Sequence, residues 1–535
     1  MSKRLLALGA ATLPLWILIG ILVGREALTQ GPGTVSGIVV DAHGPVGGAV
    51  VRQQTTRNRT TSAADGSFSL GDLPEGITVT VTAWSEGYYP GGTAVVPSAA
   101  GVTITLLPHS DVDNPDHEWY TSMPDPAAPI GCGHCMVAYP QWVTNAHGTA
   151  GTNRRFFSLY NGTDLTGTQY LGGGYVNDFP GTTGNCATCH APGAAANTPF
   201  TTDMNALAGV EQEGVFCDFC HKVADVYLNP VTGLPYSNMP GVQSIRLNRP
   251  PSDTHMFYGP FDDVTRRVSY LELEKRSQFC APCHQFSFWG TPIYQSFREW
   301  LESPYRAQGI ECQACHMTPT GVDHFVYVDK GGLIRPPDMI ASHLQPGAAD
   351  VALLQETVEM ALAVQQEMGQ AMVTVAITNT GAGHHVPTDY PGRHMILTVK
   401  AVDGVGQPLA HVGGPAVPAW GGAQAGEPGK AYAKVLRDVA TGKAPVVSYW
   451  KQTQIASDNR IAALGGDAST YAFAVPRAGG TVTVTAELRF RRVFQEVADA
   501  RGWDVPDIVM EEQETVLVAA PWWAAYLPLV GWRGE

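Results

Sequence analysis

The ten cysteines of this chain fall into five Cys-x-x-Cys pairs, and four of the pairs are followed directly by histidine. Cys-x-x-Cys-His is the attachment signal of c-type haem: both thiols form thioether bonds to the porphyrin, and the adjacent imidazole becomes an iron ligand. Zinc ribbons also use paired Cys-x-x-Cys units, but zinc does not explain a histidine after four pairs. The sequence therefore predicts covalent haems on Cys186, Cys189 and His190; on Cys217, Cys220 and His221; on Cys280, Cys283 and His284; and on Cys312, Cys315 and His316.

The fifth pair, Cys132 and Cys135, is followed by Met136 where a proximal histidine would stand. One interpretation is a fifth haem with Met136, or a residue from elsewhere, on its iron; thioether ligation raises the reduction potential. Alternatively, the two thiols form a disulfide in an oxidising compartment. A redox-active dithiol is a third interpretation, but nothing nearby predicts the βαβ context that such motifs need. The expected cofactor is haem c, with four groups or, if the fifth pair carries one, five.

The composition favours loops and short strands over long solvated helices, because only 15% of the 535 residues are charged while glycine (59) and proline (39) are abundant. The length predicts about three domains. The net charge of −15 argues against nucleic acid as a partner and favours basic redox partner proteins through electrostatic steering. Acidity that only serves solubility is an equal alternative.

The first 30 residues carry a targeting or anchoring signal. Lys3 and Arg4 precede an uncharged run, residues 5–24, which is long enough to span a bilayer. A cleaved signal peptide would have a shorter apolar core and a small-x-small cleavage site. We therefore expect an uncleaved transmembrane helix in preference to a signal peptide. It would anchor the protein to the cytoplasmic membrane, with the rest in the periplasm or outside a bacterial or archaeal cell.

Two stretches of the chain show strand patterns. In the first, residues 31–108, runs rich in Val, Ile and Thr alternate with turn signals at 34–40, 49–54, 67–70, 78–83 and 102–107. In the second, residues 347–520, apolar residues alternate around a turn at Met368-Gly369 and again in residues 395–402, 471–475, 481–490 and 515–519. We expect a small β domain and a β-sandwich cap. The aromatic tail that follows is either a contact for a membrane surface or partner, or packs on the protein itself.

Between these stretches, residues 109–346 are punctuated by Gly, Pro and His, as expected of a chain wrapped around cofactors. Near the third and fourth Cys-x-x-Cys-His motifs, apolar residues recur at helical spacing, which predicts a short helix whose apolar face covers porphyrin. These residues are Tyr294, Phe297, Trp300 and Leu301.

Several motifs are similar to known families. The segment GTVSGIVVDAHGPVGGAVV and the turn Asp65-Gly66-Ser67-Phe68 resemble the carboxypeptidase regulatory-like β-sandwich, which implies a spacer or binding module without chemistry of its own. Over roughly residues 125–515 the chain resembles multihaem c-type cytochromes of the cytochrome c554-like group. The motifs that carry this resemblance are GCGHCMVAYPQWVTNAHGTA, with Tyr139 and Trp142; Tyr258-Gly259-Pro260; IRPPDMIASHLQPG; and NTGAGHHVPTDYPGRHMIL.

The second resemblance implies that His147, His343 and His384 are distal iron ligands. Relatives often carry a further ligand histidine before Cys280, where this chain has Arg266 and Arg267; His255 or Met256 could substitute, although His255 is as readily a surface residue. His324 and His385 are weaker alternatives to His343 and His384. Asp389 stands where the family has Gly.

The expected fold is multidomain. It comprises a transmembrane anchor or signal segment (1–30), a small carboxypeptidase regulatory-like β-sandwich (31–108), a loop- and helix-rich multihaem cytochrome c domain (109–346), a C-terminal β-sandwich cap that supplies a haem ligand (347–520) and an aromatic tail (521–535). The expected function is electron transfer between respiratory partners along mostly bis-histidine haems. The alternative is a multihaem oxidoreductase that acts on a small nitrogen or sulfur compound at one haem with an open distal side.

Overall fold

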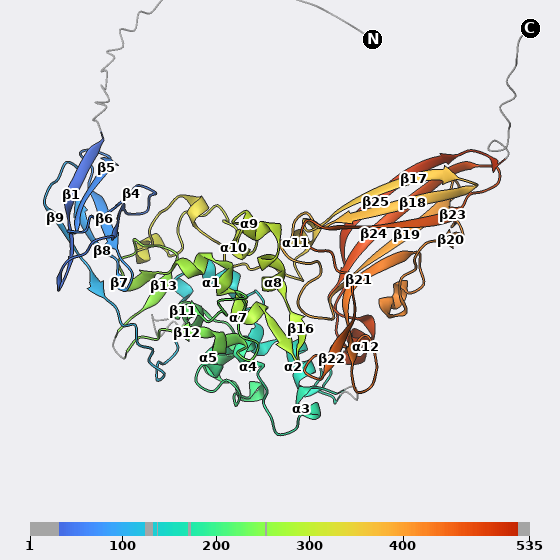
Figure 1. Cartoon of the computed structure of the whole chain (residues 1–535), viewed down its shortest axis with the longest axis horizontal. Helices are drawn as coiled ribbons and strands as arrows, with labels where there is room; N and C mark the ends of the chain where they lie inside the picture. Colours follow the sequence, from blue (N-terminus) through green and yellow to red (C-terminus); the bar gives the residue numbers. More distant parts are fainter. Residues whose placement is uncertain (1–31, 124–131, 136, 170–172, 252–253, 523–535) are drawn as a thin grey trace, which may run out of the picture.

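The computed structural model describes residues 32–123, 132–135, 137–169, 173–251 and 254–522. Two β-rich parts lie at opposite ends of the molecule, and a loop-rich central region lies between them (Figure 1). In the orientation of Figure 1 the N-terminal part is at the left in blue and the C-terminal part is at the right in orange and red.

The N-terminal part is built from two small sheets with the strand orders β2-β1-β5 and β4-β3-β6-β8, and β9 pairs in parallel with β1. Fully buried aliphatic side chains, among them Val35, Val39, Val51 and Val81, fill the space between the sheets. The five expected strands correspond to β1, β3, β5, β6 and β9. The strands are β1 Gly33–Asp41, β2 Gly44–Pro45, β3 Val50–Gln53, β4 Arg59–Thr61, β5 Ser67–Leu73, β6 Val79–Trp84, β7 Tyr88–Tyr89, β8 Gly91–Val95, β9 Val102–Thr105 and β10 Leu107–Pro108.

The central region has short helices and two-stranded ribbons joined by long loops. The longest α-helix among the described residues is α2, with eight residues, so the expected helix-rich domain is wrong: single turns and loops predominate. Its helices are α1 Ala138–Trp142, α2 Arg154–Asn161, α3 Tyr175–Asp178, α4 Ala187–His190, α5 Pro192–Ala195, α6 Cys217–Cys220, α7 Ala281–His284, α8 Ser296–Leu301, α9 Pro304–Ala307, α10 Cys312–His316 and α11 Val351–Gln355. Its strands are β11 Val223–Val226, β12 Ile245–Leu247, β13 Phe257–Gly259, β14 Val268–Tyr270, β15 Phe286–Phe288 and β16 Thr291–Tyr294.

None of the helices formed by the described residues has the length and apolar character needed to cross a membrane. This finding contradicts the first element of the expected fold class and the expected membrane-anchored localisation. The stretch on which that expectation rested, residues 1–30, lies outside the described residues.

The C-terminal part consists of two sheets, with the strand orders β17-β18-β23-β20 and β22-β21-β19-β24-β25. A cluster of fully buried side chains, including Val373, Leu397 and Tyr471, fills the space between them. As expected, β17 and β18 form a hairpin around Met368 and Gly369, whose positive φ values of 44° and 78° suit a two-residue hairpin turn. The elements are β17 Glu359–Glu367, β18 Gln370–Thr378, β19 His394–Asp403, β20 His411–Gly413, β21 Gly429–Asp438, β22 Thr453–Asp458, β23 Gly466–Ala474, β24 Gly480–Arg491, α12 Gln495–Arg501 and β25 Ile508–Ala519.

Buried ion pairs fasten both β-rich parts to the central region. On the N-terminal side, Arg52 pairs with Asp262 at 2.8 Å. On the C-terminal side, Arg460 pairs with Glu299 at 2.7 Å, and both of these side chains are 5% exposed. Because a buried charge that loses its partner is costly, these pairs fix how the three parts sit against each other.

Candidate functional site

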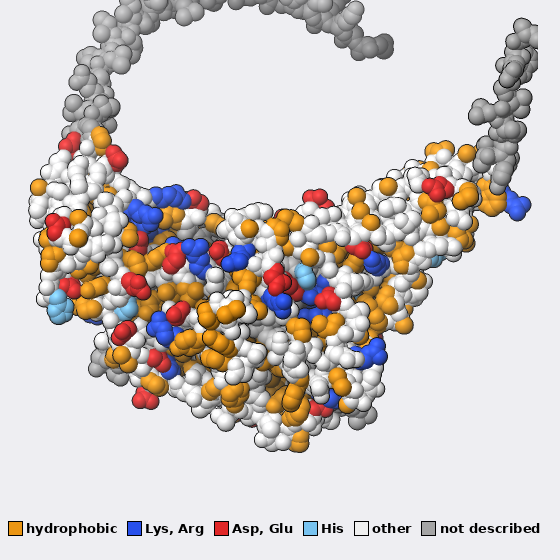
Figure 2. Space-filling view, in the orientation of Figure 1, with side chains coloured by type: hydrophobic (Ala, Val, Ile, Leu, Met, Phe, Trp, Pro, Cys, Tyr) orange, Lys and Arg blue, Asp and Glu red, His pale blue; other side chains and the backbone are white. Residues whose placement is uncertain are grey.

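A cavity of about 1420 Å³ occupies the central region. It is larger than the roughly 300–1,000 Å³ of an ordinary small-molecule site, so it has room for several large ligands. Figure 2 shows hydrophobic side chains spread over the outer face of the same region. The cavity is lined by the cysteines of four Cys-x-x-Cys pairs, namely Cys132, Cys135, Cys186, Cys189, Cys217, Cys220, Cys280 and Cys283.

Each Cys-x-x-Cys pair lies on or at the start of a single helical turn. Residues at i, i+3 and i+4 share one face of a helix, so the four turns that a histidine follows present both thiols and the imidazole in the same direction. No disulfide links any of the ten cysteines, Cys132 and Cys135 included. The turns are the 3-10 turn η1 Cys132–His134 and the helices α4, α6, α7 and α10.

Thiols of different pairs lie close enough to shift each other's pKa values. The neighbouring Cys132 thiol lowers the pKa of Cys217 to about 7. In the same way the Cys283 thiol lowers the pKa of Cys189, and the Cys280 thiol lowers the pKa of Cys312. These effects link the Cys132 pair to the Cys217 pair, and the Cys189 and Cys312 pairs to the Cys280 pair. The charge of Cys220 acts on both Cys280 and Cys283, so the five pairs, far apart in the sequence, form one cluster.

Three pairs of histidines face each other in this region. The ring centres are 6.2 Å apart for His147 and His284, 6.5 Å for His221 and His343, and 6.4 Å for His316 and His384. Imidazole nitrogens bind a metal ion of this class at about 2.0–2.1 Å, so two rings on opposite sides of one ion have centres about 6.2 Å apart. Each pair therefore has the spacing that bis-imidazole ligation of one iron requires.

Hydrogen bonds at Nδ1 orient most of these imidazoles and leave Nε2 as the free nitrogen. Nδ1 of His221 is 2.7 Å from the Tyr258 carbonyl, and Nδ1 of His316 is 2.8 Å from the Pro346 carbonyl. Nδ1 of His147 is 2.6 Å from Gln345 Oε1. This arrangement fits metal ligation, because a ligating histidine almost always donates its other ring N–H to a protein acceptor.

Burial keeps several of these histidines neutral, which is the form that binds metals. Burial lowers the pKa values of His147, His190 and His343 to about 4 in each case. His284 and His221 differ. Burial lowers the pKa of His284, but the hydrogen bond and charge of Asp389, together with the charges of Cys312 and Cys189, outweigh burial and raise it. Burial likewise lowers the pKa of His221, and the charge and hydrogen bond of Glu274, with smaller effects from Cys217 and the Tyr258 carbonyl, raise it.

His190 lacks a facing histidine among the described residues. Its ring instead stacks on Phe156, with centres 4.1 Å apart and planes within 24°. Tyr449 lies near Cys186 and Cys189, the cysteines that precede His190. Burial raises the pKa of Tyr449, and Tyr294 and these two cysteines raise it further. The Tyr294 hydroxyl donates to the Tyr449 hydroxyl at 2.8 Å. This part of the cavity is therefore lined by phenols rather than by a second imidazole.

The surroundings of the Cys132–Cys135 pair are only partly described. Met136 lies outside the described residues. His255 lines the cavity, but its ring is exposed and meets Tyr120 edge-on at 5.3 Å rather than another histidine. The Tyr89 hydroxyl donates to the His255 carbonyl at 2.6 Å, which ties this segment to the N-terminal part.

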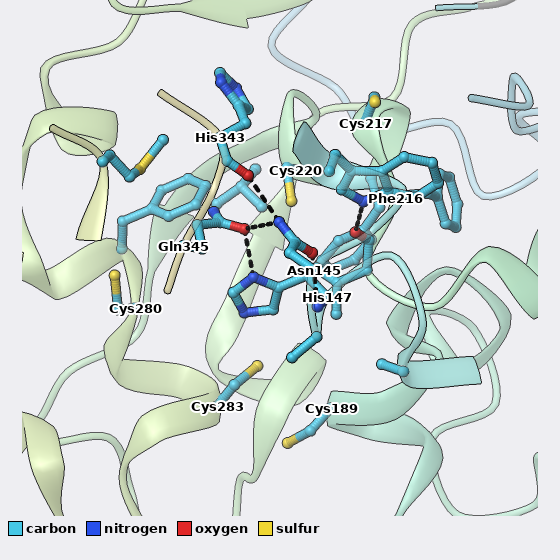
Figure 3. Close-up of a pocket in the computed structure, with 18 of the residues that line it drawn as sticks. Asn145, His147, Cys189, Phe216, Cys217, Cys220, Cys280, Cys283, His343 and Gln345 are labelled. Carbon is cyan, nitrogen blue, oxygen red and sulfur yellow. Dashed lines mark hydrogen bonds between the residues drawn. The ribbon is translucent and has the colours of Figure 1, made fainter. Parts of the chain in front are cut away.

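Two polar residues that the sequence analysis did not single out link the histidine pairs. Asn145 Nδ2 donates to the His343 carbonyl at 2.7 Å and to Gln345 Oε1 at 3.0 Å. Figure 3 shows His147 bonded to Gln345, with Cys280, Cys283 and Cys189 around it. Both residues could have been found by their closeness in sequence to a predicted ligand histidine. Asn145 stands two positions before His147, and Gln345 stands two positions after His343.

The expected helix with an apolar face is α8, but its packing differs from the expectation. Phe297 and Trp300 are buried against Ala281 in a protein cluster and do not line the cavity. Tyr294 does line the cavity, from strand β16. The helix therefore supports the turn that carries Cys283 and His284 from behind.

Comparison with known proteins shows a likeness of fold. No protein-family model matches the chain, and no curated protein matches it either. Among solved structures, a cohesin–X-dockerin complex from Acetivibrio cellulolyticus (20% identity, 14% of this chain and 58% of that chain, TM-score 0.13) and a structural-genomics target (10% identity, 34% and 96%, TM-score 0.14) are too distant to carry an argument. The penta-haem cytochrome c552 from Thermochromatium tepidum is 18% identical over 72% of this chain and 97% of that chain, with a TM-score of 0.54. The chain therefore shares the fold of a multihaem cytochrome c.

Proposed function

We propose that the protein is a multihaem c-type cytochrome that transfers electrons along a contiguous array of haems. The observation that carries the proposal is the set of three facing histidine pairs with ring centres 6.2–6.5 Å apart. A bis-imidazole iron has no open position for substrate, so such a haem passes electrons only. Bound haem iron supplies one-electron chemistry by cycling between its ferric and ferrous forms.

Cysteines and histidines of this chain would hold three of these haems in different ways. Each Cys-x-x-Cys pair would form the two thioether bonds, and the histidine that follows it would bind the iron from one side. The opposite ligand would be His343 for His221, His147 for His284 and His384 for His316. Thiols of neighbouring pairs shift each other's pKa values, which supports close spacing of the haems.

We assign a fourth haem to Cys186, Cys189 and His190, and a fifth to Cys132 and Cys135. The fifth assignment is supported by the position of this pair, which lines the common cavity and is close enough to Cys217 to shift its pKa. Met136 and His255 are the candidate ligands for it. The named fold neighbour, a penta-haem protein, agrees with five haems.

We also retain the expected division of the chain. Residues 31–108 would be a carboxypeptidase regulatory-like module, residues 109–346 the haem-carrying domain of a cytochrome c554-like protein, and residues 347–520 a cap that supplies His384. With a net charge of −15, the protein would attract basic redox partner proteins.

A second candidate function follows from His190, which has no facing histidine among the described residues. The haem held there could bind a small nitrogen or sulfur compound on the side lined by Tyr294 and Tyr449. Electrons would then enter or leave through the three bis-histidine haems.

The test is to produce the full chain in a host that matures c-type cytochromes. We expect the mass of the polypeptide plus five haems, and a low-spin optical spectrum for the three bis-histidine haems. A high-spin component that shifts when nitrite or hydroxylamine is added would support the second function. A colourless product with the mass of the bare polypeptide would overturn both functions.

A further inference from the structure

Asp389 is a buried carboxylate that contacts the candidate proximal ligand of one haem. Its Oδ2 accepts a hydrogen bond from His284 Nδ1 at 3.3 Å and another from Ser296 Oγ at 3.0 Å. Its Oδ1 accepts from the backbone N–H groups of Gln295 and Ser296 at 3.0 and 3.1 Å. The residue is 8% exposed.

The carboxylate is charged in this position. Its two oxygens accept from four donors: the His284 ring, the Ser296 hydroxyl and the backbone N–H groups of Gln295 and Ser296. A buried carboxylate with four hydrogen-bond donors can stay ionised because each donor offsets part of the lost hydration. A full negative charge therefore lies against the ring of His284.

The backbone at Asp389 is also unusual, with φ at +59°. Aspartate and asparagine adopt this left-handed region more readily than most residues, and glycine adopts it freely. Glycine would therefore satisfy the turn, and an aspartate there adds a charge that the turn itself does not need. This observation points to a role for the side chain rather than for the backbone.

Two other histidines of the facing pairs have neutral acceptors at Nδ1. His316 has the Pro346 carbonyl and His147 has the Gln345 amide. His221 has the Tyr258 carbonyl at 2.7 Å and shares a more distant carboxylate, Glu274, at 3.2 Å. Asp389 is the acceptor that gives His284 an anionic partner without a competing carbonyl.

We propose that Asp389 lowers the reduction potential of the haem held by Cys280, Cys283 and His284. This inference rests on the proposed function. A carboxylate at Nδ1 makes the imidazole a stronger donor, and its negative charge favours ferric iron, which carries one more positive charge than ferrous iron. The step is a one-electron reduction supplied by a redox partner, and no proton has to move.

The test is potentiometry of the holoprotein with the substitution Asp389→Asn, which keeps the size, the acceptor for the Ser296 N–H and the left-handed backbone. We expect one one-electron component to become about tenfold easier to reduce, which is about +59 mV. Asp389→Gly suits the backbone but lacks the carboxylate, so it should raise the reduction potential of the same component. It replaces the asparagine variant if that protein does not accumulate.

Ser296→Ala is the matched control, because it disturbs the same loop but leaves the carboxylate in place. Losing the Ser296 hydroxyl frees Asp389 to bond His284 more strongly, so the potential should stay unchanged or fall. Equal upward shifts in Ser296→Ala and Asp389→Asn would overturn the inference, because a loosened loop would then explain both. Fully loaded Asp389→Asn and Asp389→Gly proteins with wild-type potentials would also overturn it, yet leave the proposed function intact.

Discussion

The imidazole rings of His316 and His384 face each other with centres 6.4 Å apart and planes within 15°. His316 ends helix α10 of the central region, whereas His384 comes from the loop between β18 and β19 of the C-terminal part. The C-terminal sandwich therefore does more than cover the central region. Under the proposed function it completes a haem site that the central region begins.

Replacing His384 by alanine should leave the number of haems unchanged but remove one distal ligand. The thioether bonds come from Cys312 and Cys315, so the mass should still show every haem. One haem should change from low spin to high spin, which optical and electron paramagnetic resonance spectra detect.

His385 provides the control for this prediction, because it is adjacent but lies 3.5 Å from the Glu299 carboxylate instead of facing His316. His385→Ala should keep the wild-type spectrum. A high-spin signal in His385→Ala and none in His384→Ala would reverse the assignment of the two residues.

The proximal half of each site could be predicted from the sequence because its geometry is local. Cysteines at i and i+3 and a histidine at i+4 share one face of a single turn wherever that turn lies in the fold. Which distal histidine faces which turn depends on tertiary packing. His147 faces His284 and His343 faces His221, and no spacing in the chain encodes those pairings.

The strands, too, could be predicted only where their signal is local. The β17–β18 hairpin was predicted because alternating apolar residues flank Met368 and Gly369, a local signal. Strand β21 was missed because almost all of its residues, including Lys434, are buried, so it shows no alternation. The apolar run of residues 5–24 predicted a membrane helix from composition alone, and no helix in the described part of the chain supports it.

The double substitution Cys132→Ser and Cys135→Ser tests the fifth haem. We expect the holoprotein mass to fall by one haem, because these thiols line the shared cavity and would form the thioether bonds. Cys186→Ser with Cys189→Ser should also remove one haem and calibrates the measurement. An unchanged haem count in the first variant would mean that Cys132 and Cys135 serve another purpose, such as a disulfide.

Glu299→Gln should destabilise the interface between the central region and the C-terminal part. Glu299 pairs with Arg460 and also accepts from the Thr388 hydroxyl at 2.6 Å and the His385 N–H at 3.2 Å. Breaking a buried pair costs roughly 3–5 kcal/mol, and here about 3 kcal/mol is expected because Arg460 keeps Asp458. The lower unfolding free energy should be measurable by denaturant unfolding.

Glu302→Gln is the control on the same stretch of chain, because Glu302 pairs with Arg298 at the surface and its side chain is 63% exposed. An exposed pair contributes at most about 1 kcal/mol, so this variant should stay close to wild type. If the two variants lost the same stability, burial of the Glu299 pair would not be what joins the two parts.

Because Lys434 is buried, we expect the stability of the protein to depend on pH in a specific way. It is 3% exposed in β21 and donates to the Ile293 carbonyl at 2.6 Å; burial, together with the nearby charge of Arg460, lowers its pKa to about 8 from 10.5. Between these two pH values the unfolded chain binds more protons at this residue than the folded chain does. The free energy of unfolding therefore rises with pH in this window. Below pH 8 the burial of the charged lysine destabilises the fold by its full amount, about 3 kcal/mol.

Lys434→Met removes both this cost and a hydrogen bond worth about 1 kcal/mol, so the variant should be more stable at pH 7 by about 2 kcal/mol. Its advantage should shrink as the pH rises from 8 towards 10, because the wild-type lysine then becomes neutral. Lys400→Met, at a side chain that is 64% exposed on the same sandwich, should show no such trend. A constant difference between Lys434→Met and wild type across this range would mean that Lys434 keeps an ordinary pKa and that its burial costs nothing through ionisation.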